Sequence, residues 1–103
     1  MNKDEFTITK EKIPGGLKFK LKGRVNSANA SSIQYNLDEA LKEGAKRIIL
    51  NMLLVEFLSS AGIRVILKAH KDLVKIGGTF GIEQPSENVR NVLGMVALSE
   101  MLI

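Results

Sequence analysis

The sequence contains no cysteine and no tryptophan, and its 103 residues include one histidine, one tyrosine and two prolines. The lack of cysteine excludes disulfides and thiolate metal sites, and it fits a cytoplasmic protein. His70 has no clustered partners, so neither a zinc site nor a histidine-based triad is expected, and a hydrogen-bonded histidine at the core boundary is the ordinary interpretation. We therefore expect no metal and no cofactor, and a binding protein instead of an enzyme.

Long apolar runs are missing as well. No stretch approaches the roughly 18 uncharged apolar residues of a membrane-spanning helix, so direct membrane insertion is not expected. The opening residues 1–5 are followed by no apolar core region, unlike a secretory signal peptide. With 45% apolar residues, the chain can form one core of ordinary size but is too short for two. The sequence predicts a single domain over residues 1–103.

The formal net charge of +4 is concentrated near the N-terminus. Residues 1–24 hold seven basic and three acidic residues, and the remainder holds eight of each. Lys18, Lys20 and Lys22 alternate with apolar residues, which places the three lysines on one face of a strand. Because only five aromatic residues are available for base stacking, we interpret this as a solvated sheet face and expect no nucleic-acid partner. A basic face can still steer an acidic protein partner.

Strand patterns and helix patterns alternate along the chain. Two segments of alternating polarity, 6–10 and 17–24, flank a Pro-Gly-Gly turn signal and predict an N-terminal hairpin. The elements predicted after it are a helix over 27–42, a buried strand at 48–50, a helix from Ser60 to about Gly77, a strand over 79–83, a helix from Pro85 to a break at Gly94, and a short helix over 97–102. This order predicts an α/β fold, in which a small mixed β-sheet with an N-terminal hairpin carries about four helices packed mainly on one face.

The run Phe57–Leu67 joins a stiff apolar stretch to an amphipathic one. Ser59 and Ser60 stand between them, and serine is a preferred helix N-cap, so one of the two should lie where a buried strand passes into a helix. Unpaired backbone N–H groups and the positive end of the helix dipole favour an anionic group at such a place. The pattern fits either a plain N-cap or a hydroxyl that carries a phosphate, and the residues alone favour the plain cap.

The string LSSAGIRVIL at 58–67, together with the order of the elements, resembles the STAS domain, in particular the bacterial anti-sigma factor antagonists. Three further segments fall in line with the family at the expected distances. The segment 23–30 is similar to the opening of the family's first helix, 77–82 to the turn into its last strand, and 84–93 to the start of its penultimate helix. The resemblance covers nearly the whole chain and implies a STAS-like fold.

The resemblance implies a partner switch that phosphorylation controls. The unphosphorylated form would bind an anti-sigma factor that is also a serine protein kinase, and phosphorylation would abolish this binding until a phosphatase of the PP2C type reverses it. By its match to the motif, Ser60 is the acceptor and Ser59 is the second choice. The partner-binding residues implied in the same way are Asn26, Ser59, Ser60, Ala61, Gly62 and Arg64.

Three positions depart from the family's pattern, and each lacks an expected carboxylate. Asn26 replaces the aspartate of the first motif, Asn51 replaces an acid at the end of the central strand, and Ser59 replaces the acid before the acceptor serine. Asparagine keeps the capping ability of aspartate without its charge. Because the first of these acids is tied to kinase recognition in related proteins, Asn26 implies altered recognition.

Two other functions stay open at this point. A STAS subunit docked permanently to a membrane transport complex would use the same surface without phosphorylation, and the missing carboxylates fit it. Nucleotide binding or hydrolysis is the weakest alternative, because the chain has no phosphate-binding glycine loop and no acid–base pair. The apolar Met52, Leu53 and Leu54 stand where the family has a polar turn, and they form either an extension of the core strand or an exposed patch for self-association.

Overall fold

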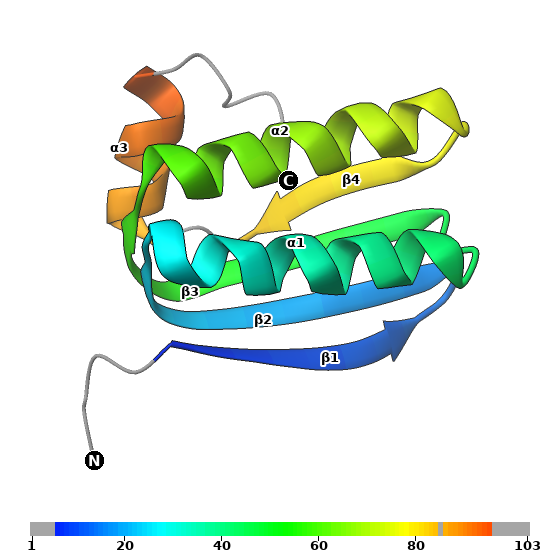
Figure 1. The fold of residues 1–103 in the computed structure, drawn as a ribbon, viewed down its shortest axis with the longest axis horizontal. Coiled ribbons are helices and arrows are strands. Elements are labelled where there is room, and N and C mark those ends of the chain that lie inside the picture. Colours follow the sequence, from blue (N-terminus) through cyan, green and yellow to red (C-terminus); the bar gives the residue numbers. More distant parts are fainter. Residues whose placement is uncertain (1–5, 85, 96–103) are drawn as a thin grey trace.

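The computed structural model describes residues 6–84 and 86–95, which form a four-stranded sheet with three helices (Figure 1). A β-hairpin opens the chain, and helices and strands alternate after it, as the sequence predicts. The elements in chain order are β1 (Thr7–Ile13), β2 (Gly16–Val25), α1 (Ser27–Lys42), β3 (Arg47–Leu58), α2 (Ser60–Lys75), β4 (Thr79–Glu83) and α3 (Glu87–Met95).

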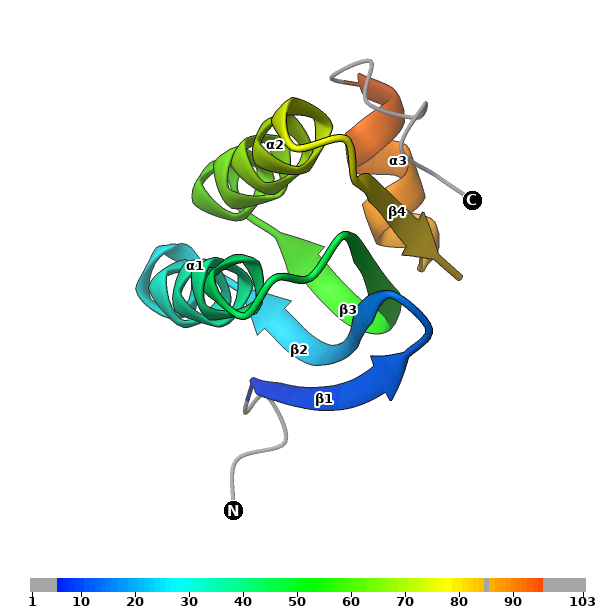
Figure 2. The same ribbon diagram turned by 90° about the vertical axis from the view of Figure 1, so that its right-hand side faces the viewer.

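The strand order in the sheet is β1-β2-β3-β4. β1 pairs antiparallel with β2, whereas the pairs β2–β3 and β3–β4 are parallel, so the sheet is mixed. Each parallel connection passes through a helix, and two crossovers of the same hand that proceed in the same direction place their helices on one face. Figure 2 shows α1 and α2 side by side on that face. The predicted hairpin, mixed sheet and one-sided helix layer are confirmed.

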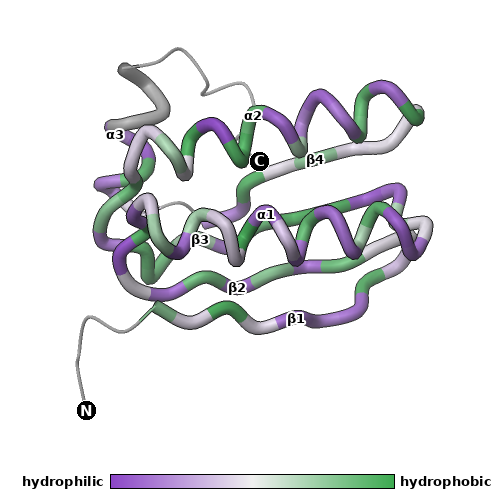
Figure 3. The backbone as a smooth tube through the Cα atoms, viewed as in Figure 1, coloured by the Kyte–Doolittle hydropathy of each residue, from purple (hydrophilic) through white to green (hydrophobic). Residues whose placement is uncertain are grey.

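One apolar layer lies between the sheet and these two helices. Phe19 and Leu21 of β2 point into it together with Leu50 of β3, and each is at most 1% exposed. Each helix contributes one apolar stripe, which Figure 3 shows as alternating hydropathy along α1 and α2. Leu37 of α1 and Leu73 of α2 are as deeply buried. Removal of these side chains from water holds the helices on the sheet.

β3 carries two β-bulges in its second half. Its pairing register with β2 shifts twice, and each shift adds one extra residue to β3. The buried side chains of this half are therefore Met52, Val55 and Leu58, three residues apart instead of two. Between them, Leu53 and Leu54 are 52% and 43% exposed. The three apolar residues 52–54 therefore have different environments. Met52 extends the core strand, and Leu53 and Leu54 form an exposed patch.

The C-terminal part departs from the predicted boundaries. α3 passes through Gly94 and runs to Met95, although the sequence predicts a break at the glycine. The short helix predicted over 97–102 lies outside the described residues, so three of about four predicted helices are described. Within residues 6–84 and 86–95, no helix is long and apolar enough to cross a membrane.

Candidate functional site

The strand-to-helix junctions before α1 and α2 lie together at one edge of the sheet. β2 and β3 are parallel neighbours, so their carboxyl ends point to the same side (Figure 1). The backbone links the two junctions directly, because the Ser59 N–H donates to the Val25 carbonyl at 2.9 Å. Ligands of open α/β sheets commonly bind at this edge. The predicted partner-binding residues gathered here are Asn26, Ser59, Ser60, Ala61, Gly62 and Arg64.

Two asparagines form a reciprocal cap at the start of α1. The Asn26 Oδ1 accepts from the Asn29 N–H, and the Asn29 Oδ1 accepts from the Asn26 N–H, each at 2.9 Å. The Asn29 Nδ2 also donates to the Arg24 carbonyl at 2.7 Å. This is a capping box in which asparagine stands where Glu or Gln is usual. Asn26 thus keeps the capping role of an aspartate without bringing a charge to this edge.

The two serines before α2 have different environments. Ser59 is the N-cap, with an extended backbone (φ −76°, ψ 167°), and its Oγ accepts from the Gly62 N–H at 3.1 Å. Ser60 is the first residue of the helix and is exposed, and its hydroxyl bonds to no described residue. The Ser60 and Ala61 N–H groups find no acceptor in the described part of the chain either. A free hydroxyl therefore stands beside two free donors at a helix N-terminus.

This difference predicts unequal responses to alanine. Ser59→Ala removes the cap and should lower the free energy of unfolding by about 0.5–2 kcal/mol. Ser60→Ala removes an exposed hydroxyl and should change it by less than about 0.5 kcal/mol. Urea denaturation of both variants and the wild type measures the two differences. An equal loss in the two variants would show that both serines serve as caps.

Gly62 lets the first turn of α2 lie directly on the strand ends. A Cβ at this position would be 2.7 Å from Val25 Cγ1 and 2.8 Å from Leu58 Cδ1. Carbon atoms in contact are ordinarily about 3.5–4.0 Å apart, so with a larger residue either these two side chains or the first turn of α2 would have to shift. Gly62 is itself buried. It contributes to the site through the path of the backbone and not through an exposed surface.

A groove runs between the first turns of α1 and α2. Ala61 and Arg64 line it, and its α1 side begins at Ser27, directly after Asn26. Neither helix has an acidic residue in its first turn. The full lining of this groove of about 370 Å³ is Ser27, Ala30, Ser31, Gln34, Ala61, Arg64 and Val65. The edge therefore combines free helix N–H groups, small side chains and one arginine.

Asn51 belongs to a polar network on the sheet face that α1 and α2 leave uncovered. Its Nδ2 donates to Glu83 Oε2 and to Gln84 Oε1, both at 3.0 Å, and its Oδ1 accepts from the Leu53 N–H at 3.2 Å. Lys18 Nζ lies 2.8 Å from Glu83 Oε2. The hydrogen bond from Lys18, followed by that from Asn51, lowers the pKa of the Glu83 carboxyl. An aspartate at position 51 would face this carboxylate, so asparagine suits the network.

The network corrects the interpretation of the lysine face in one respect. Lys18 is paired with Glu83 of β4, whereas Lys20 and Lys22 are exposed as expected. The sequence does not indicate the network, because its members come from β2, β3, β4 and the residue that follows β4, and they meet only when the strands align. No local pattern connects them.

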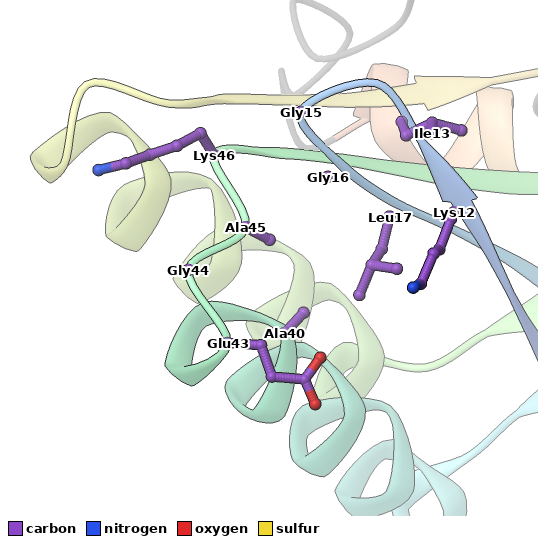
Figure 4. Close-up of a pocket in the computed structure, with 10 residues that line it drawn as sticks. All are labelled: Lys12, Ile13, Gly15, Gly16, Leu17, Ala40, Glu43, Gly44, Ala45 and Lys46. Carbon is purple, nitrogen blue, oxygen red and sulfur yellow. The ribbon is translucent and has the colours of Figure 1, made fainter.

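A hollow of about 530 Å³ lies at the other end of the sheet, between the β1–β2 turn and the α1–β3 connection (Figure 4). Small side chains and backbone form much of its lining, with Lys12 and Glu43 among the charged residues there. None of the predicted site residues lines it. Among the described residues, no three His, Cys, Asp or Glu side chains are grouped so that they could hold a metal ion.

Known proteins are similar to this chain over most of its length. The family model of the STAS domain matches residues 7–102. BtrV of Bordetella bronchiseptica, which is described as an anti-sigma factor antagonist, is 35% identical over 85 residues. The matched part is 82% of this chain and 73% of BtrV.

Solved structures have the same fold. The anti-sigma factor antagonist SpoIIAA in its unphosphorylated form has a TM-score of 0.85 at 22% identity, over 94% of this chain and 86% of SpoIIAA. The phosphorylated form of Bacillus SpoIIAA has a TM-score of 0.77 at 21% identity, over 96% and 89% of the two chains. The crystal structure of TM1081 from Thermotoga maritima has a TM-score of 0.79 at 26% identity, over 92% and 82%. The chain therefore belongs to the STAS domain family, and the relatives it matches are of the anti-sigma factor antagonist type.

Proposed function

We propose that this protein is a cytoplasmic anti-sigma factor antagonist and acts as a partner switch that phosphorylation controls. The unphosphorylated form binds an anti-sigma factor that is also a serine protein kinase, and so frees the sigma factor that this partner holds. The observation that carries the proposal is the exposed Ser60 hydroxyl at the N-terminus of α2, which bonds to none of the described residues. The description of BtrV supports the same class of partner.

The kinase would supply the chemistry and this chain the acceptor. The Ser60 Oγ attacks the γ-phosphorus of ATP, the Oγ–P bond forms as the bond to the ADP oxygen breaks, and the hydroxyl proton passes to a base of the kinase. The phosphoserine carries about −1.5 to −2 charges and three acceptor oxygens. The free N–H groups of Ser60 and Ala61 and the helix dipole stabilise this group without refolding of the domain.

The added charge acts on the partner complex. Before modification, the edge presents small side chains and no acid in the first turn of either helix, with Asn26 and Arg64 beside the groove. A partner surface that fits this edge meets an uncompensated dianion after phosphorylation, which opposes binding. A PP2C-type phosphatase would hydrolyse the phosphoserine and restore the neutral edge.

Co-expression with the cognate serine kinase tests the acceptor. We expect one phosphate per chain, located on Ser60 by tandem mass spectrometry. Ser60→Ala should abolish the modification, while Ser59→Ala should keep it, because the Ser59 Oγ is engaged by the Gly62 N–H. Phosphate found on Ser59 alone, or on neither serine, would contradict the assignment.

A STAS docking subunit of a membrane transport complex, without phosphorylation, is the second candidate. Exposed Leu53 and Leu54 favour it, because permanent interfaces are more hydrophobic than transient ones. Of the three residues for which the sequence leaves self-association open, Met52 is fully buried, and Leu53 and Leu54 are exposed. The candidates differ in one result, since a docking subunit would bind its partner equally well with and without a charge at Ser60.

A further inference from the structure

The sheet face opposite α1 and α2 carries a row of cations beside a row of apolar side chains. Lys20, Lys22 and Arg24 are exposed on β2. Leu54 pairs with Lys22 and Phe57 pairs with Arg24, and these two β3 side chains are 43% and 41% exposed. The Arg24 guanidinium lies 4.6 Å from the centroid of the Phe57 ring. We call these five residues the basic-apolar face.

The cations of the basic-apolar face are not neutralised within the described residues. None of the ion pairs among the described residues involves Lys20, Lys22 or Arg24. The neighbours on β1 are uncharged, because Thr9 stands opposite Lys20 and Thr7 stands opposite Lys22. The face therefore presents three positive charges in a row, and an acidic partner complements it.

A groove of about 300 Å³ deepens the face between Leu54 and the start of α3. Lys22, Leu53 and Leu54 line it, and Glu56 is the one acid in its lining. Lys22 and Glu56 balance one another in this lining, so the excess of positive charge on the face comes from Lys20 and Arg24, which lie outside the groove. Leu53 and Leu54 are exposed in the groove, so an apolar side chain of a partner can pack against them there.

The spacing of the cations fits a helix that lies along the strands. Alternate residues of a strand are about 6.6 Å apart, and residues four apart on a helix are about 6 Å apart along its axis. Acids at positions i, i+4 and i+8 of a helix therefore match Lys20, Lys22 and Arg24 in step. β2 and β3 are neighbouring strands, which lie about 4.8 Å apart. An apolar stripe beside the acidic stripe of the partner helix would therefore contact Leu54 and Phe57.

We propose that the basic-apolar face is a second docking surface, and that its occupant is an acidic amphipathic helix of a partner protein. A helix laid on an open sheet face is an ordinary layer arrangement, and burial of Leu54 and Phe57 adds to the charge attraction. This surface lies on the side of the sheet away from α1 and α2 (Figure 2). It can be occupied independently of the phosphorylation of Ser60, so the protein joins two partners at once.

The test uses a fluorescent peptide of about 15 residues, stapled to stay helical, with glutamate at i, i+4 and i+8 and leucine at i+3 and i+7. We expect the full chain to bind it in fluorescence anisotropy, and more weakly at high salt. The double substitution Lys20→Glu and Lys22→Glu should weaken binding at least about tenfold, and Leu54→Gln about threefold. The matched control, Lys71→Glu with Lys75→Glu on exposed positions of α2, should change binding less than about twofold.

Other outcomes would overturn the proposal. If the two double variants lose affinity for the peptide equally, net charge alone attracts the peptide to the protein. The same conclusion would follow if a peptide of the same composition in scrambled order bound equally well. Binding of phosphatidylserine vesicles or an RNA oligonucleotide without binding of the peptide would give the face another class of partner. If the wild type self-associates in sedimentation and Leu54→Gln does not, the occupant of the basic-apolar face would be a second copy of the chain.

A separate variant distinguishes this surface from the partner switch. Ser60→Asp should bind the helical peptide as the wild type does, within about twofold, because the residue lies at the start of α2 and not on the basic-apolar face. Circular dichroism establishes that every variant is folded before its binding is compared. A weakened peptide complex in Ser60→Asp would show that the two surfaces are not independent and would overturn the proposal.

Discussion

Ser60→Asp is expected to weaken the complex with the cognate anti-sigma factor at least about tenfold, or about 1.4 kcal/mol of binding free energy. The substitution places a carboxylate at the first residue of α2, where the proposed phosphate would stand. A charge that the partner surface does not compensate opposes association. Isothermal titration calorimetry with the purified partner measures the difference.

The same substitution should leave the fold intact. α2 has no acidic residue in its first turn, so a carboxylate there interacts favourably with the helix dipole. Ser60 is exposed and Ser59 keeps the cap, so no buried contact is lost. We expect the unfolding temperature to change by no more than about 5 °C. Lost binding with an intact fold is what a switch requires.

Ser32→Asp is the matched control. Ser32 is an exposed serine on α1 that does not line the groove between the helices, so the same change of charge should leave affinity within about twofold. Equal binding by wild type and Ser60→Asp would rule out the switch and leave the docking subunit as the leading function. Weakened binding in both variants would mean that net charge, and not the position of Ser60, controls affinity.

Gly16→Ala is expected to lower the free energy of unfolding by about 3 kcal/mol, because the position has no room for a side chain. A Cβ there would lie 1.7 Å from the Arg47 carbonyl oxygen and 2.6 Å from its carbon. Both obstacles are backbone atoms at the first rung of the β2–β3 pairing, so relief requires the strands to separate. For a domain of this size, the loss corresponds to a fall of roughly 12–24 °C in the unfolding temperature.

Gly15→Ala provides the comparison for that measurement. Gly15 precedes Gly16 in the β1–β2 turn, has φ of +81°, and has no atom within 4 Å of a built Cβ (Figure 4). Alanine there is strained by the backbone conformation alone, at about 1–2 kcal/mol. Thermal unfolding by circular dichroism should therefore rank the wild type above Gly15→Ala, and Gly15→Ala above Gly16→Ala. The reverse order of the two variants would show that the close approach of the strands is not what limits residue 16.

Local pattern predicts much of this fold. The helix over 27–42 has its predicted bounds, and the hairpin lies where alternating polarity flanks the Pro-Gly-Gly turn. These features depend on neighbours in the chain, because apolar residues recur at a different period in a helix than in a strand. The start of α2 is predicted to within one residue for the same reason, since serine favours the N-cap. The position of the candidate site along the chain therefore follows from the sequence alone.

The choice between the two serines is decided by the sheet. Ser59 and Ser60 are equally good caps as residue types, so no propensity separates them. The Ser59 N–H is bound to the Val25 carbonyl of the adjacent junction, which holds Ser59 in the extended conformation of an N-cap. Ser60 then becomes the first helical residue, with its hydroxyl exposed. Which of the two serines has the exposed hydroxyl therefore follows from a backbone contact between the ends of two strands.

The second half of β3 shows the same division between local pattern and tertiary contact. Its buried residues recur every third position because of the two bulges against β2. In the same half, the Ser86 N–H donates to the Met52 carbonyl at 3.1 Å and the Ser86 hydroxyl donates to the Val55 carbonyl at 2.6 Å. Asn51 and Glu83 add a side-chain bond beside the first bulge. The sequence determined the order and type of the elements, since these depend on periodicity among neighbours. The bulges, the exposed leucines and the polar network depend on hydrogen bonds between residues more than thirty positions apart, and only the folded chain brings those groups together.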